Sequence, residues 1–181
     1  MVVLTYTKED GSQEQVEFKD TVTVMDLQGK GIKTIDLTPL SSCTNLRGLW
    51  LHYNQLQTID LFPLSSCPNL QLLWLPSNRL QSIELAPLSS CTSLQTLELG
   101  SNQLQAIDLS PLSSCPNLQT LLLNNNQLQT IDLSPLSSCT NLQQLDLSYN
   151  QLQTIDLSKV GEDRVYKCDY CGTMGKASPW L

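Results

Sequence analysis

A 24-residue period runs through most of this chain and constrains its fold more than any other feature. A triplet of Ile, an acidic residue and Leu recurs without insertion or deletion. The triplets begin at Ile35, Ile59, Ile83, Ile107, Ile131 and Ile155. Two further columns keep the same spacing, namely Cys43, Cys67, Cys91, Cys115 and Cys139, and Asn54, Asn78, Asn102, Asn126 and Asn150. A fixed period of this length is typical of a solenoid, in which each unit packs against its neighbours.

The apolar residues of one unit predict how it folds. Leu121 and Leu123 alternate with other residues, which indicates a short strand with one buried face. After Asn126 the apolar residues come every two or three positions, too closely for one face of a long helix. We therefore expect a chain that bends around a core, with each strand pairing in parallel with the next. The 36 leucines of the chain supply this core.

The asparagine and cysteine columns predict two buried ladders. A side-chain amide can donate and accept at once, so stacked asparagines can pair the backbone groups of adjacent coils, each of which costs about 1–3 kcal/mol if buried unpaired. Cysteine is a small, frequently buried side chain. Stacked thiols would come close enough for disulfides, but regular burial inside each coil favours free thiols.

The segment that begins with Ser110 and Pro111 predicts one short helical turn on the back of each coil. Serine is a common helix N-cap and proline a common first residue. Phe62 and Ala86 replace the serine in two units, where we expect weaker capping.

The pattern Leu-x-x-Leu-x-Leu-x-x-Asn-x-Leu resembles the leucine-rich-repeat signature. It occurs at 46–56, 70–80, 94–104, 118–128 and 142–152, and a degenerate copy at 22–32 has Lys30 in place of the asparagine. The resemblance implies an α/β-type repeat solenoid. This is a curved horseshoe with a parallel sheet on its concave face and short helical or extended segments on its convex face. We assign residues 22–157 to these repeats.

The ends of the chain carry most of its charge and depart from the period. Residues 2–6 and 14–18 are strand-like and flank a turn signal at 9–12, so residues 1–21 are predicted to form a β-hairpin cap. A binding hairpin is the alternative interpretation. Residues 158–181 are predicted to form a C-terminal cap or tail.

Cys168 and Cys171 lie in this tail as Cys-x-x-Cys-Gly, which is similar to a zinc-knuckle half-site. Zinc normally takes four ligands, and the sequence offers no second pair. Three interpretations follow: a plain cap with reduced thiols, a zinc shared with another chain or with further sequence, and a redox-active pair or disulfide. The chain is otherwise expected to need no cofactor.

Composition excludes several functions. A net charge of −7 argues against a nucleic-acid partner, and no apolar run is long enough for a membrane span. The single histidine, and the lack of a nucleophile–base set or a Gly-rich phosphate loop, argue against an enzyme. Unpaired cysteines without a signal peptide predict a cytoplasmic protein.

The strand positions between the core leucines would face the concave surface, and they vary where the core does not. Trp50 and Trp74 are expected to lie exposed side by side there. Leu72, His52, Tyr53, Glu98, Leu122 and Asp146 complete the candidate partner-binding residues. Exposed apolar patches with tryptophan and tyrosine usually mark interaction sites, and the acidic residues could accept a basic group. The alternative is that this variation is drift and that the aromatic pair only stabilises the sheet.

The sequence therefore favours a non-enzymatic scaffold that binds a protein or peptide on its concave face. A structural, near-consensus solenoid without a ligand is the second hypothesis, and a zinc-linked oligomer through the tail is the third. A monomer is expected, with a zinc-linked dimer as the alternative.

Overall fold

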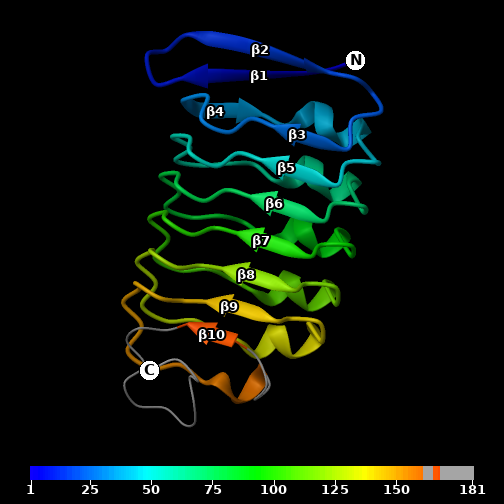
Figure 1. Ribbon diagram of the computed structural model, residues 1–181. Helices are drawn as coiled ribbons and strands as arrows, with labels where there is room; N and C mark the ends of the chain where they lie inside the picture. Colours follow the sequence, from blue (N-terminus) through cyan, green and yellow to red (C-terminus); the bar gives the residue numbers. More distant parts are fainter. Residues whose placement is uncertain (161–164, 168–181) are drawn as a thin grey trace.

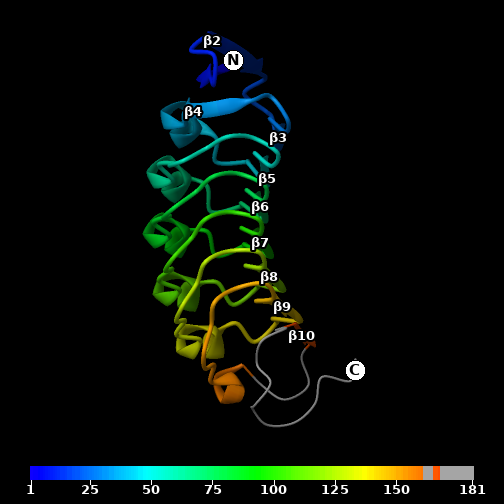
Figure 2. The same cartoon turned by 90° about the vertical axis from the view of Figure 1, so that its left-hand side faces the viewer.

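The computed structural model describes residues 1–160 and 165–167. The chain winds as a stack of coils with a parallel sheet on one side and short 3-10 turns on the other, and Figure 2 shows the sheet side gently concave. The sheet contains β3 (Val24–Asp26), β5 (Gly48–Trp50), β6 (Leu72–Trp74), β7 (Thr96–Glu98), β8 (Thr120–Leu122), β9 (Gln144–Asp146) and β10 (Val165–Lys167), in that spatial order. The predicted solenoid with a parallel concave sheet is confirmed.

The core consists of the leucine columns, as the repeat predicted. Leu121 and Leu123 are fully buried, and the same holds for their counterparts Leu73, Leu75, Leu97 and Leu99. Each coil thus places two strand leucines inward and leaves the residues between and beside them on the concave surface. This arrangement fixes which side chains a partner could meet.

Each coil turns back through a five-residue 3-10 helix, which confirms the predicted short convex segment. The helices are η1 (Thr38–Ser42), η2 (Phe62–Ser66), η3 (Ala86–Ser90), η4 (Ser110–Ser114) and η5 (Ser134–Ser138), followed by the shorter η6 (Leu157–Lys159). Proline in the first turn of η1 to η5 pre-sets the backbone angle for the turn.

The predicted serine N-cap is wrong. Ser110 lies inside η4, and Leu109 occupies the cap position without a side-chain bond. The acidic residue of the repeated triplet pairs a free amide at the start of the turn instead, because Asp108 Oδ1 accepts from the Ser110 amide at 2.8 Å. This bond needs only a backbone N–H, so Asp60 holds the Phe62 amide at 2.8 Å and Glu84 holds the Ala86 amide at 3.0 Å. The expectation of weaker capping in those two units is therefore also wrong.

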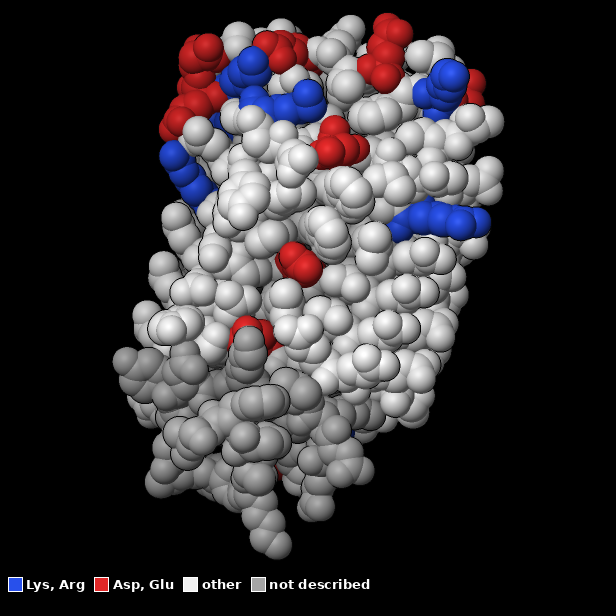
Figure 3. Space-filling model, in the orientation of Figure 1, with Lys and Arg blue, Asp and Glu red and all other residues white. Residues whose placement is uncertain are grey.

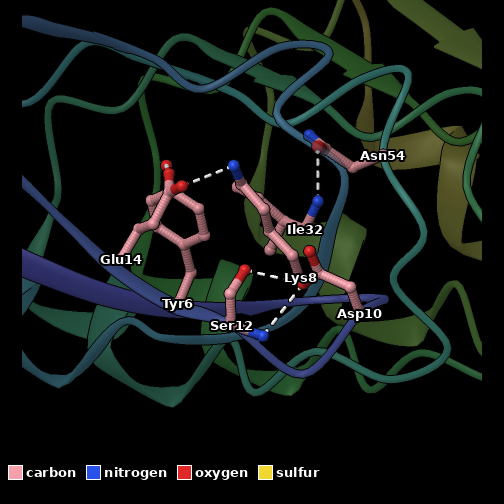
Figure 4. A network of polar contacts seen from close by, with 7 residues as sticks. All are labelled: Tyr6, Lys8, Asp10, Ser12, Glu14, Ile32 and Asn54. Carbon is pink, nitrogen blue, oxygen red and sulfur yellow. Dashed lines mark hydrogen bonds and ion pairs between the residues drawn. The ribbon is translucent and has the colours of Figure 1, made fainter.

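The asparagine column forms a continuous buried ladder, as predicted. Asn102 Oδ1 accepts from the Leu80 amide of the preceding coil at 3.0 Å. Its Nδ2 donates to Leu75 O of that coil at 3.1 Å and to Leu99 O of its own at 3.0 Å. The same pattern repeats at Asn54, Asn78, Asn126 and Asn150, and Figure 4 shows the first bond, between Ile32 and Asn54.

The exception at Lys30 has a geometric reason. Each ladder asparagine bonds to the coil before it, and the first coil has none before it in this sheet. The backbone groups of that coil, such as Ile32 N and Leu27 O, are paired by Asn54 of the next coil. An exposed lysine therefore leaves no ladder group unpaired.

All five ladder cysteines are buried, and Cys43, Cys67, Cys91 and Cys115 are free, as expected. Cys91 Sγ donates to Leu64 O of the preceding coil at 3.3 Å, and Cys67, Cys115 and Cys139 make the equivalent contact. Burial raises the pKa of Cys91 to about 12 and that of Cys67 and Cys115 to about 11. These thiols are poor nucleophiles and act as packing residues.

The predicted N-terminal hairpin is present as β1 (Val2–Lys8) and β2 (Gln13–Phe18). Val2, Leu4 and Tyr6 are buried against the first coil. The Tyr6 hydroxyl donates to Glu14 at 2.7 Å, and Lys8 pairs with the same carboxylate (Figure 4).

The hairpin is joined to the repeats more closely than the sequence indicated. β1 also pairs with β4 (Ile32–Asp36) of the first coil, giving a three-stranded antiparallel sheet. At the hairpin tip, Arg79 Nη1 donates to Glu9 Oε1 at 2.8 Å. The cap therefore reaches from the first coil to the third.

At the other end, β10 extends the sheet beyond the predicted limit of the repeats. Val165 is in parallel register with Gln144 of β9, so the strand pairing continues although the 24-residue spacing does not. Val160 is buried in the core, which agrees with its expected role in covering the last coil. Cys168 and Cys171 lie outside the described residues.

Candidate functional site

Strand register places five of the candidate residues and Asp26 in one line across the concave sheet, which we call the concave row. It runs in the order Asp26, Trp50, Trp74, Glu98, Leu122 and Asp146. Neighbouring strands lie about 4.8 Å apart, so each member is adjacent to the next. The solenoid thus brings together residues 24 positions apart in the chain.

The two tryptophans stack on each other. Their ring centroids are 5.0 Å apart and the ring planes differ by 13°. They lie side by side as predicted, but the expectation that they are exposed is wrong, because both are only partly accessible. A Cβ atom at Gly48, at the start of the same strand, would lie 3.3 Å from Val24 Cγ1 and 3.4 Å from Trp50 Nε1, so a larger residue there would be closely packed between them. Gly48 was not among the predicted site residues.

His52 and Tyr53 border the tryptophan pair at the end of β5. The His52 ring meets Trp74 edge-on at 5.9 Å and Tyr53 at 5.2 Å. Tyr53 has a positive φ of 56°, an uncommon conformation for a non-glycine residue, and its side chain is 67% exposed. The half-buried Leu72 pairs in register with Gly48 beside them. Trp50, His52, Tyr53, Leu72 and Trp74 form one cluster, which we call the aromatic patch.

Several polar atoms of the aromatic patch are buried without a partner. Trp50 Nε1, Trp74 Nε1 and His52 Nδ1 make no hydrogen bond within the described residues. Buried donors and acceptors are usually paired in folded proteins, and an unpaired one costs about 1–3 kcal/mol. The aromatic patch therefore contains buried polar atoms without hydrogen bonds, whereas the asparagine ladder pairs the buried backbone groups along the stack.

The acidic members of the concave row differ in their surroundings. Asp26 accepts from the Gln28 amide at 3.0 Å, and Asp146 accepts from the Ser148 amide at 3.0 Å. Glu98 makes no hydrogen bond or ion pair among the described residues, and burial raises its pKa. A partly buried carboxylate without a partner is the most unusual charged group on this face.

From β3 to β9 the concave surface has acidic groups and no Lys or Arg. The four columns that face it, which begin at positions 24, 26, 28 and 29, contain Asp26, Glu98 and Asp146 in these six coils, and the next strand, β10, places Lys167 in register with Asp146. Figure 3 shows separate acidic groups down an otherwise uncharged face, with most basic groups near the first coil and at its margins. This face therefore attracts cations and repels anions.

The structure does not gather all predicted residues in one place. Leu122 and Asp146 belong to the concave row, but they lie on β8 and β9, beyond Glu98 and away from the aromatic patch. His52 has no acid or nucleophile as a hydrogen-bond partner within the described part of the chain.

Two further polar features of the described residues were not anticipated. Asn69, Asn117 and Asn141 form a second, exposed ladder, each donating to the preceding coil at 2.9–3.1 Å. A polar hollow opens near the start of β3 and β5 and is lined by Thr21, Thr23, Asn45, Arg47 and Asn69. The 24-residue spacing of the asparagines could have revealed the ladder, but the hollow depends on how adjacent coils meet.

Residues 1–160 and 165–167 contain no group of three His, Cys, Asp or Glu side chains placed to hold a metal ion. The zinc hypothesis concerns Cys168 and Cys171, which are outside this part of the chain. Within the same residues, no helix has the length and apolar character needed to cross a membrane.

Comparison with known proteins gives consistent matches to one kind of repeat. Residues 68–128 match a family described as leucine rich repeat, and residues 116–159 match a family described as leucine rich repeats in two copies. Together these matches cover 68–159, about half of the chain. No curated protein sequence matches the chain significantly.

Solved structures show the same likeness. A leucine-rich-repeat protein of Leptospira interrogans is 27% identical with a TM-score of 0.63, over 71% of this chain and 32% of that protein. Internalin C2 of Listeria monocytogenes is 26% identical with a TM-score of 0.55, over 81% and 80% respectively. An internalin, InlF, of the same organism is 28% identical with a TM-score of 0.56, over 76% and 45%. The chain thus spans about a third of the Leptospira protein and most of internalin C2.

Proposed function

Because this chain belongs to the leucine-rich-repeat family, we propose that it is a non-enzymatic scaffold that binds a protein or peptide on its concave face. Leucine-rich-repeat domains are typically protein-binding scaffolds. The proposal assigns the binding to the aromatic patch, with Glu98, Leu122 and Asp146 as outlying contacts.

The observation that carries this proposal is the aromatic patch itself. The core columns are nearly identical from coil to coil, whereas aromatic rings that contact one another gather on the concave side of two adjacent coils, with Tyr149 alone in a later coil. Trp and Tyr supply large contact areas at low entropic cost and are common at the centre of interfaces. The unpaired nitrogens of Trp50, Trp74 and His52 give a partner a further energetic reason to bind there, provided the rings adjust.

The competing hypothesis is a structural solenoid in which the tryptophan pair only strengthens the sheet. Cross-strand aromatic pairs contribute about 0.2–1 kcal/mol, so stabilisation alone could account for Trp50 and Trp74. It does not account for Tyr53, whose side chain is 67% exposed beside the His52 ring. We therefore favour partner binding over a purely structural role for the aromatic patch.

The test compares two surfaces of the same protein. The double variant Trp50→Ala and Trp74→Ala removes the centre of the aromatic patch, and Phe62→Ala removes a 71% exposed aromatic side chain on η2, on the opposite side. Proximity labelling or pull-down should recover a specific set of partners with the wild type and Phe62→Ala, and lose it with the double variant. Unchanged capture by a double variant that unfolds like the wild type in urea would reject the site.

We also keep two proposals that concern the whole chain. The free, buried thiols of Cys43, Cys67, Cys91 and Cys115 support a reducing cytoplasm. Cys168 and Cys171 are proposed as half of a zinc site, which would join two chains. Native mass measurement with and without a chelator tests the second proposal, because a dimer that survives zinc removal, or a monomer under both conditions, contradicts it.

A further inference from the structure

The concave row places one carboxylate at each end of the tryptophan pair. Asp26 is in register with Trp50, and Trp74 is in register with Glu98. Three strand spacings of about 4.8 Å separate the two acids, a span of roughly 14 Å. The order acid, indole, indole, acid occurs nowhere else among the described concave positions.

The stacking geometry engages one face of each indole and turns the other face away from the pair. The centroid separation of 5.0 Å matches the spacing of neighbouring strands, so the rings stack along the row. The outer face of Trp74 is therefore turned toward β7, which carries Glu98, and the outer face of Trp50 toward β3, which carries Asp26. An indole face next to a carboxylate is a favourable environment for a cation, because the ring quadrupole and the anion attract it together.

Charge balance also points to a cationic partner. The concave positions carry no Lys or Arg that could neutralise Glu98. An apolar partner would bury this carboxylate further without pairing it, which is costly. An acidic partner or nucleic acid would be repelled.

Building on the proposed function, we propose that the partner is a basic, extended segment with two Arg or Lys side chains, one pairing with Glu98 beside Trp74 and the other pairing with Asp26 beside Trp50. In an extended chain, side chains four residues apart lie on the same side and about 13 Å apart. This separation matches the distance between the two acids. The preferred motif is therefore a basic residue, three others and a second basic residue.

A peptide selection on the whole chain tests this inference. A displayed library of 12-residue peptides is selected on immobilised protein, and the same library is selected on the Trp50→Ala and Trp74→Ala double variant. Peptides that depend on the tryptophans should be enriched in two basic residues at the four-residue spacing. A synthetic peptide with two arginines at this spacing should bind about tenfold more tightly than one of the same composition with adjacent arginines.

Matched variants separate the local carboxylate from overall charge. Glu98→Gln should weaken binding of the arginine peptide about tenfold, and added salt should reduce the difference. Asp108→Asn is the control, because it removes one negative charge on an exposed side of the stack while an amide oxygen can still hold the Ser110 amide. Equal losses for both variants, or none, would overturn the assignment of Glu98.

The outcomes also separate this inference from the proposed function. Peptides that depend on the tryptophans but lack paired basic residues would overturn the inference and leave the concave binding site in place. If no selected peptide depends on the tryptophans, both proposals fail.

Discussion

Replacing Asn102 by Ala tests how the stack is held together. Among the described residues, Asn102 is the only hydrogen-bond partner of the buried Leu80 amide, so removing its side chain leaves this amide without an acceptor. Asn102 Nδ2 makes its two shorter bonds to Leu75 O and Leu99 O, which keep a second donor from Asn78 and Asn126 respectively, and its longer contact is to Gly100 O, which keeps the Ser77 amide. The variant thus creates one unpaired buried donor and weakens two shared acceptors.

These losses give the expected magnitude. An unpaired buried amide costs about 1–3 kcal/mol and each lost hydrogen bond about 0.5–1.5 kcal/mol, so Asn102→Ala should lower the free energy of unfolding by roughly 2–6 kcal/mol. Urea unfolding followed by circular dichroism measures the change. The control is Asn117→Ala in the exposed ladder, which breaks a single bond to Thr92 O and should cost about 1 kcal/mol or less.

Because neighbouring asparagines donate to the same carbonyl, we expect their contributions to the free energy of unfolding to be coupled. In the double variant Asn78→Ala and Asn102→Ala, Leu75 O loses both of its donors. The double variant should therefore lose more stability than the sum of the two single variants, whereas Asn54→Ala with Asn126→Ala, which share no acceptor, should be additive. Equal losses for Asn102→Ala and Asn117→Ala, or an additive neighbouring pair, would refute the account of the ladder.

Three further measurements follow from single interactions. Burial raises the pKa of Glu98, so the folded protein holds the carboxyl proton more tightly than the unfolded chain does. Glu98→Gln should therefore raise the free energy of unfolding at pH 7, by an amount that shrinks as the pH falls through the raised pKa toward 4.5. The five ladder cysteines should resist a thiol reagent in the native protein and react in urea, and rapid native labelling of Cys91 would contradict its buried, high-pKa thiol. Arg79→Ala breaks the exposed pair with Glu9, so the free energy of unfolding should hardly change, while amide exchange at the hairpin tip quickens in low salt; unchanged exchange would show that this contact does not hold the cap.

The sequence predicted those features in which a residue type and a period have one physical consequence. Buried leucines at alternate strand positions, an amide at the turn and a small thiol at the far corner each allow one role in a stack. The parallel sheet, the asparagine ladder, the free cysteines and the concave row followed from that reasoning. The same logic would have found the exposed ladder of Asn69, Asn117 and Asn141.

The errors concern features that depend on side-chain rotamers or on local competition. Ser110 and Asp108 are both typical capping residues, and only the start of η4 decides that the aspartate holds the amide. The partial burial of Trp50 depends on how its ring stacks on Trp74 and packs near Gly48. The spacing of residues in the sequence does not reveal this packing. β4 forms because the hairpin lies beside the first coil, whereas equivalent segments in later coils have no antiparallel partner among the described strands.

The most direct test of concave recognition is to map the bound surface in solution. Amide chemical shifts of the whole protein would be followed during titration with the arginine peptide selected on it. The account predicts that the largest shifts fall on β3, β5, β6 and β7 and on the indole N–H groups of Trp50 and Trp74, with little change in η1 to η5. Shifts centred on the 3-10 turns or on the N-terminal hairpin, with the tryptophan signals unmoved, would contradict it.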